Sequence, residues 1–183
     1  VLRAARGDGG GLLWSVTDPS WAVEPDAALA AGDVDGDGWP EIVAVDPGGH
    51  LMLFDRFGQP IWRTAEALAG SQRGAPFLTD LGADGSVEIL YGNQAFSSAG
   101  ARLWQGGAGI GSNACRQEFP TSFTADLDLD GVQEVVVGNA AYGPEGNTLW
   151  ANGLPDGFPA VGNFDGDPEG EIVVVSCNQV RLL

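Results

Sequence analysis

The sequence predicts an all-β protein in which short antiparallel strands form repeated four-stranded sheets, and two recurring markers lead to this fold class. An acidic phrase begins 47, 46 and 37 residues apart, at Asp33, Asp80, Asp126 and Asn163. A second phrase, out of step with the first, closes 48, 42 and 46 residues apart, at Trp14, Trp62, Trp104 and Trp150. Both markers share a period of about 45 residues, which indicates an internal repeat and suits a blade of four short strands.

Each repeat arranges its expected strands in the same order. An apolar stretch leads into the acidic phrase, and a β-branched run follows, as in EIVAV from Glu41 and EVVVG from Glu134. Such runs predict strands that are buried on both faces. A turn, a weaker third strand, a second turn and the strand that ends in tryptophan complete the repeat, and no stretch has helical periodicity. Since one blade cannot cover its own faces, neighbouring blades are expected to stack as a β-propeller.

The repeat divides the chain into one propeller segment of about four blades. Residues 1–22 are interpreted as the outer strands of a preceding blade, followed by repeats at 23–66, 67–108 and 109–152 and the start of a fourth at 153–183. Both ends of the chain fall in the register of the third strand. We therefore expect an incomplete ring or part of a larger propeller, whose terminal strands pair with additional blades or another copy.

The tryptophans divide into two groups. The four in the recurring phrase are expected to pack between blades, because large aromatic side chains supply much apolar area. Trp21 and Trp39 fall outside that series and are the better candidates for surface recognition. Trp39 lies inside the first acidic phrase, where shielding of the loop is the alternative role.

The composition excludes several classes of function. The chain has 183 residues, with 25 acidic against 8 basic side chains and a net charge of -17, which repels nucleic acid and anionic membrane surfaces. No apolar run approaches the roughly 20 residues needed to cross a bilayer, so no membrane insertion is expected. Cys115 and Cys177 form no CxxC pair, and His50 is the single histidine, which excludes a zinc site. The sequence leaves open whether the two cysteines form a disulfide.

The acidic phrases have the spacing of a calcium loop. Oxygen donors stand at positions 1, 3, 5 and 9, which suits a hard cation that takes about six to eight oxygen ligands. In the first loop the expected side-chain ligands are Asp33, Asp35, Asp37 and Glu41, with the carbonyl of Trp39 at position 7. We expect three to four Ca²⁺ ions in the chain.

The other loops repeat this set with two departures. The third loop offers Asp126, Asp128, Asp130 and Glu134, with the carbonyl of Val132. The fourth offers Asn163, Asp165, Asp167 and Glu171, with the carbonyl of Glu169, and has Pro168 at position 6. The second has Gly82 at position 3, which leaves Asp80, Asp84 and Glu88, with the carbonyl of Ser86. The second loop is therefore expected to bind most weakly.

Two alternatives to strand-joining calcium loops fit the sequence less well. Asp and Gly are ordinary turn formers, so one such loop is explained equally well as a solvated acidic turn. Four in register are not, because carboxylates about 4 Å apart repel by roughly 1 to 4 kcal/mol per pair, which a cation removes. An EF-hand needs an acidic residue at position 12, where this chain has Ala44, Tyr91, Val137 and Val174.

The phrases AGDVDGDGWPEIV, TADLDLDGVQEVVVG and VGNFDGDPEGEIVVV resemble the FG-GAP or VCBS repeats of integrin α-subunit propellers and of many bacterial secreted proteins. The resemblance covers essentially the whole chain. It implies that each loop joins the first two strands of a blade, binds calcium through positions 1, 3, 5, 7 and 9, and stiffens a scaffold for adhesion or ligand binding. Gly82 and Pro168 depart from the family pattern, which affects the second and fourth sites.

These features predict an extracellular or cell-surface, non-enzymatic scaffold for adhesion, binding or assembly, with a protein or glycan ligand. Millimolar calcium outside cells matches the weak affinity of such loops. A lectin propeller and part of a calcium-dependent polysaccharide lyase are the alternatives, and the lyase is disfavoured by one histidine and no lysine. The tripeptide Arg6-Gly7-Asp8 is interpreted as a turn rather than an integrin ligand. The sequence does not identify the ligand, the number of blades in the parent protein, the oligomeric state or the source.

Overall fold

The structure is a computed structural model that describes residues 1–113, 115 and 119–183. Its described part is all-β, and apart from strands it holds one 3-10 turn, η1 (Pro19–Trp21). None of the helical structure in this part is long and apolar enough to span a bilayer. The expectation of an all-β chain is confirmed.

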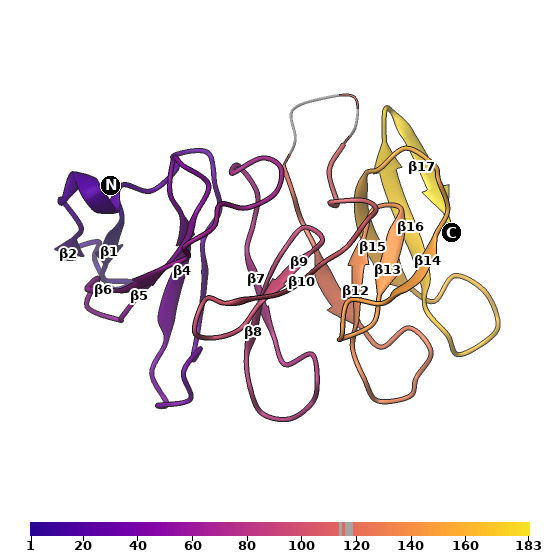
Figure 1. Cartoon of the computed structure of the whole chain (residues 1–183), viewed down its shortest axis with the longest axis horizontal. Coiled ribbons are helices and arrows are strands. Elements are labelled where there is room, and N and C mark those ends of the chain that lie inside the picture. The colour runs from indigo at the N-terminus through magenta and orange to yellow at the C-terminus, as the bar shows by residue number, and fades with distance from the viewer. Residues whose placement is uncertain (114, 116–118) are drawn as a thin grey trace.

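The strands form five antiparallel sheets in chain order (Figure 1). The first and last sheets are the smaller ones: β1 (Arg3–Ala5) and β2 (Leu12–Ser15); and β15 (Phe158–Gly162), β16 (Glu171–Ser176) and β17 (Gln179–Leu182). The three between them have four strands each: β3 (Ala30–Gly32), β4 (Glu41–Val45), β5 (Leu51–Phe54) and β6 (Pro60–Arg63); β7 (Phe77–Thr79), β8 (Glu88–Tyr91), β9 (Gln94–Phe96) and β10 (Arg102–Gln105); β11 (Phe123–Ala125), β12 (Glu134–Val137), β13 (Ala140–Tyr142) and β14 (Thr148–Ala151).

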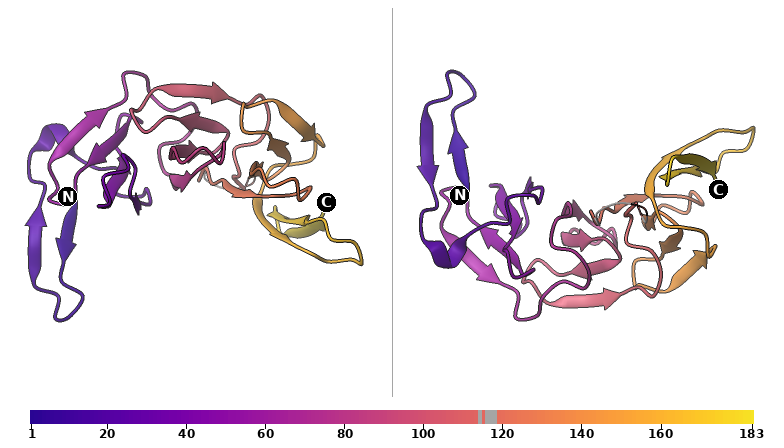
Figure 2. Two further views of the ribbon diagram at one scale, coloured as in Figure 1. Left: turned by 90° about the horizontal axis from the view of Figure 1, so that it is seen from below. Right: turned by 90° about the horizontal axis from the view of Figure 1, so that it is seen from above.

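Strand order within the sheets follows the sequence repeat. The β-branched strands β4, β8, β12 and β16 each pair with the strand before and the strand after them. The four acidic loops therefore all join the first and second strands of a sheet, and they lie along the lower edge of the molecule in Figure 1. The sheets follow one another around an open arc, and the described residues close no ring (Figure 2).

The hydrophobic core is divided into four clusters, one between each pair of neighbouring sheets. Strand β12 shows why: Val135 and Val137 pack towards the preceding sheet, while Val136 packs towards the following one. Alternate residues of a strand point to opposite faces, so a strand between two sheets buries every side chain. This explains the continuous apolar runs of β4, β8 and β12, whereas β16 in the last sheet is buried on one face only.

Three tryptophans of the repeated series join neighbouring sheets, as predicted. The indole Nε1 of Trp14, Trp62 and Trp104 donates to a main-chain carbonyl in the next sheet, at 2.9, 3.0 and 2.9 Å. The acceptors belong to Arg56, Ser98 and Pro144, each in the turn between a third and a fourth strand. Two residues later each turn has a glycine at positive φ, and a Cβ there would lie 2.5 to 3.0 Å from the indole. We call this contact the tryptophan seam.

Trp150, the fourth member, packs with Ile172 and Leu183 in the last core cluster. At the other end of the chain, Arg6 begins the turn between β1 and β2, where its N–H donates to the carbonyl of Gly11 at 2.8 Å. Arg6, Gly7 and Asp8 therefore lie in the turn that the sequence predicts.

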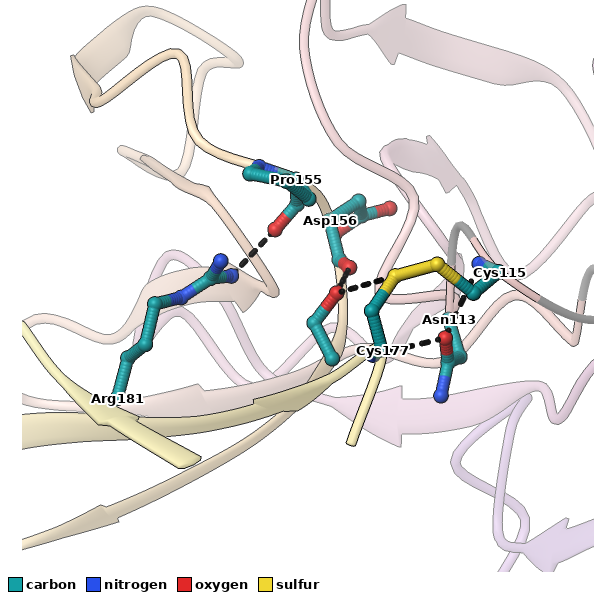
Figure 3. The surroundings of a disulfide bond; sticks show 7 residues. Asn113, Cys115, Pro155, Asp156, Cys177 and Arg181 are labelled. Atoms are coloured by element: carbon teal, nitrogen blue, oxygen red, sulfur yellow. Dashed lines mark hydrogen bonds between the residues drawn. A yellow bond between two sulfur atoms is a disulfide. The ribbon is translucent and has the colours of Figure 1, made fainter. Parts of the chain in front are cut away.

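Cys115 and Cys177 form a disulfide, with their Cα atoms 5.3 Å apart (Figure 3). Cys177 and Asn178 form the two-residue turn between β16 and β17, both at positive φ. The corresponding turns in the two preceding sheets are Gly92-Asn93 and Gly138-Asn139. The side-chain oxygen of Asn113 accepts the N–H groups of both cysteines, at 3.1 and 3.3 Å. The bond ties the segment before β11 to the last sheet and is compatible with an oxidising compartment.

Candidate metal centre

The four acidic loops are named loop 1 (residues 33–41), loop 2 (80–88), loop 3 (126–134) and loop 4 (163–171). In loops 1 to 3 a carboxylate oxygen of position 1 accepts the N–H of the position-6 glycine at 2.9 to 3.0 Å. Those glycines have φ values of 87° to 92°, a conformation that costs glycine little. The main chain is thereby wrapped around the first carboxylate. In loop 4 position 6 is Pro168, which has no N–H to donate.

The closing glutamate of each loop is the first residue of the second strand. One oxygen of Glu41, Glu88, Glu134 and Glu171 accepts the N–H of loop position 2, at 2.9, 2.9, 2.7 and 2.6 Å. This bond orients the carboxyl group, and its other oxygen remains for a ligand. Glu41 and Glu134 are only 3% and 5% exposed.

Two of the closing glutamates, Glu88 and Glu134, lie where burial first and neighbouring carboxylates second disfavour the ionised form. Burial raises the pKa of Glu134, and repulsion from Asp128, Asp130 and Asp126 raises it further, against one lowering hydrogen bond from Leu127. Burial likewise raises the pKa of Glu88, together with repulsion from two aspartates of loop 2. Both shifts show that ionised carboxylates are disfavoured here without a compensating cation.

Three loops bring three acidic side chains to one point, with ligand atoms within 4.8 Å of one another. These triads are Asp33, Asp35 and Asp37 in loop 1; Asp126, Asp128 and Glu134 in loop 3; and Asp165, Asp167 and Glu171 in loop 4. Within the described residues Glu41 and Asp130 lie outside the triads of their loops. Asn163, an amide, instead donates to the main-chain carbonyl of Asp167.

Loop 3 provides the test of whether a cation fits. Oδ2 of Asp126 accepts the N–H of Gly131, but Oδ1 is buried and has no hydrogen-bond partner among the described residues. A buried carboxylate oxygen without a partner is costly, and a bound cation removes that cost. The donor set of hard oxygens fits calcium or a similar ion.

Loop 2 keeps the backbone framework but has fewer donors. Gly82 places no carboxylate at position 3, and no triad forms there among the described residues. Both oxygens of Asp80 accept main-chain N–H groups, from Asp84 at 3.0 Å and from Gly85 at 2.9 Å. Glu88 and Asp84 remain as the other side chains with carboxylate oxygens.

The position-7 residues are held by the aspartate two positions earlier. The N–H groups of Trp39, Ser86 and Val132 each donate to a position-5 carboxylate at 2.8 Å, and that of Glu169 does so at 3.2 Å. This places the four residues in equivalent positions, and calcium coordination by their carbonyls stays a prediction. The sequence did not single out Arg56 and Phe57 in the turn between β5 and β6, where the guanidinium of Arg56 lies over the rings of both Trp39 and Phe57. The only available signal was the aromatic residue in FGQPIW.

Comparison with known proteins finds similarity in solved structures alone. No protein-family model and no curated protein matches the chain. The biofilm matrix protein Bap1 of V. cholerae superposes with a TM-score of 0.77 and 29% identity, over 94% of this chain and 28% of Bap1.

Two rhamnogalacturonan lyases have the same fold with lower identity. The lyase PL11 of Bacillus licheniformis superposes with a TM-score of 0.65 and 18% identity over 93% of this chain, and the exotype lyase YesX with 0.63 and 19% over 94%. The chain spans about a third of each lyase, 34% and 33%, and so corresponds to part of these proteins.

Proposed function

We propose that this chain is a segment of an extracellular, calcium-binding β-propeller of the FG-GAP or VCBS type, which acts as a scaffold for adhesion, binding or assembly. The observation that carries the proposal is the buried oxygen of Asp126, beside Asp128 and Glu134, which has no hydrogen-bond partner in the described part of the chain. Three to four Ca²⁺ ions would be held by the loops, and the ions would stiffen the edge where each first strand turns into the second.

The repeated sheet architecture supports the propeller part of the proposal. Each inner sheet buries one face against each neighbour, and the tryptophan seam repeats the same contact between successive sheets. The similarity to a biofilm matrix protein and the disulfide both fit an extracellular module. The domain boundaries expected from the repeat belong to the same proposal.

A non-enzymatic role is supported by the surroundings of the one histidine. Nδ1 of His50 lies 3.2 Å from both carboxylate oxygens of Asp46, and Nε of Arg63 lies 3.4 Å from one of them. The main-chain N–H of His50 also donates to Asp46 at 2.8 Å, so His50 is part of a hydrogen-bonded turn. Part of a polysaccharide lyase remains the alternative because two lyases share the fold, and turnover of pectic polymers would establish it.

Calcium-dependent stability tests the proposal directly. With a dissociation constant of about 10⁻⁴ M and about 10⁻² M calcium, each site that exists only in the folded state contributes roughly 2.7 kcal/mol. We expect the melting temperature to rise in calcium relative to chelator, and titration calorimetry to find three to four ions. Magnesium at equal concentration is the control, because it prefers a smaller and more regular site. An unchanged melting temperature in chelator would refute calcium binding.

A further inference from the structure

Two exposed aromatic rings and one arginine form a patch beside loop 1, which we call the aromatic platform (Trp39, Arg56 and Phe57). Trp39 belongs to loop 1 and is 55% exposed, and Phe57 belongs to the turn between β5 and β6 and is 58% exposed. The guanidinium carbon of Arg56 lies 3.8 Å from the centroid of the Trp39 ring and 4.6 Å from that of Phe57. These cation–π contacts gather the two rings around one cation.

The backbone that carries the platform is held in place at each of its three residues. The N–H of Trp39 donates to the carboxylate of Asp37 at 2.8 Å, and the N–H of Phe57 donates to that of Asp55 at 2.9 Å. The carbonyl of Arg56 accepts the indole N–H of Trp14 at 2.9 Å, as part of the tryptophan seam. The rings are therefore presented from a fixed position, which lowers the entropy lost on binding.

The other repeats show that the fold does not need aromatic residues here. Residues in the positions of Trp39 and Phe57 are Ser86 and Ala99 in the next sheet, and Val132 and Glu145 in the one after. Those sheets have the same strand order and the same seam contacts without an aromatic pair. Packing between sheets therefore does not explain the aromatic platform. Shielding of loop 1 does not explain it either, since both rings remain more than half exposed.

We propose that the aromatic platform binds neutral polysaccharide, with the apolar face of a pyranose ring stacked on Trp39 or Phe57. Aromatic side chains offer a flat apolar surface of the size of a sugar ring, and the N–H groups of Arg56 are donors for sugar hydroxyls. Asp55 and the net charge of -17, which three to four Ca²⁺ ions would reduce but not reverse, repel an acidic glycan, which makes the neutral class the fitting one. The inference deepens the proposed scaffold function and rests on it for the ordering of loop 1 by calcium.

Affinity electrophoresis in calcium tests this binding, because a neutral polymer in the gel does not itself migrate. The probes are dextran and galactomannan, with polygalacturonate as the acidic comparison. We expect at least one neutral polymer to retard the wild-type chain, and Trp39→Ala and Phe57→Ala to weaken that retardation by about tenfold or more. Leu103→Ala is the matched control, because Leu103 is 52% exposed on β10, and it should change retardation less than twofold.

Each other outcome overturns the inference. It fails if no neutral polymer retards the wild type, if only polygalacturonate does, or if both aromatic variants bind as the wild type does. Melting curves in calcium and chelator, run on the same samples, separate this failure from failure of the proposed function. A calcium-stabilised chain without retardation refutes the aromatic platform alone, whereas retardation without calcium stabilisation refutes the calcium scaffold.

Discussion

The tryptophan seam and the acidic loops belong to the same sheets but differ in their physical chemistry. In the seam, Trp104 lies against Gly146 so closely that no side chain fits there, and the contact is completed within the protein. In loop 3, carboxylates are gathered, and one buried oxygen of Asp126 has no hydrogen-bond partner among the described residues, so the loop offers a place for a cation. On the proposed function, we expect the loops to respond to calcium and pH, whereas the seam, a contact between protein groups alone, should respond much less.

The largest expected effect comes from filling the seam. In Gly146→Ala the new Cβ would lie 2.5 Å from the Trp104 ring, at φ 81°, so both overpacking and backbone strain apply. We expect a loss of about 3 kcal/mol in the free energy of unfolding. Urea unfolding at constant calcium measures it.

Gly10→Ala is the matched control for this substitution, because Gly10 has φ 70° and a Cβ added there would meet nothing within 4 Å. It isolates the backbone strain, which is about 1 kcal/mol. Equal losses in the two variants would show that the tightness of the seam contributes nothing.

The next largest effect distinguishes the loops from one another. Asp35→Ala removes a member of the loop 1 triad, and we expect it to lose most of the roughly 2.7 kcal/mol that a well-occupied site contributes in calcium. Asp84→Ala removes a ligand from loop 2, which has fewer carboxylates, and should cost less. Melting temperatures in calcium and in chelator measure both. A larger loss for Asp84→Ala would reverse the ranking of the loops.

The smallest effect is on the pH dependence in chelator. The raised pKa of Glu88 and Glu134 in the folded chain means that their contribution to stability is fully present below their ordinary pKa and is lost as pH rises through the raised value. Without calcium, acidification towards pH 5 should therefore relieve the repulsion, whereas in calcium it should weaken ion binding. Melting temperatures between pH 7 and 5 give both slopes. Glu134→Gln should flatten the slope in chelator, and an unaltered slope would contradict this assignment.

The all-β fold and strand order could be predicted from the sequence, because β4, β8 and β12 each lie between two sheets and have apolar runs that are buried on both faces. The same expectation is wrong for β16, where Val175 is 43% exposed because no described sheet covers that face. Packing of the tryptophan series between sheets was predicted as well. The carbonyl groups that accept the indole N–H bonds were not predicted. Nothing in the sequence around a turn glycine such as Gly58 indicates which tryptophan ring it contacts. The spacing of the acidic residues predicted which carboxylates belong to each loop. It did not predict that Glu41 lies outside the triad of loop 1.

The disulfide could not be predicted for a related reason. Cysteines 62 residues apart meet only if the arc brings the segment before β11 beside the β16–β17 turn, and that distance depends on tertiary packing. A signal did exist in the repeat, since Cys177 takes the place that Gly92 and Gly138 occupy in the equivalent turns. To recognise that a cysteine replaces a glycine there, the turns between the second and third strands must be aligned with one another. The acidic phrases alone do not provide that alignment.

The disulfide also determines how the chain would respond to a pulling force. Tension applied at the two ends passes through the bond from Cys115 to Cys177 and bypasses the residues between them. This stretch of chain, a sequence separation of 62 that includes the whole sheet of β11 to β14, would carry no load and would add about 200 Å of extension only after the bond is reduced. In a scaffold under shear, the first two four-stranded sheets would yield while loop 3 and its neighbours remain shielded from load.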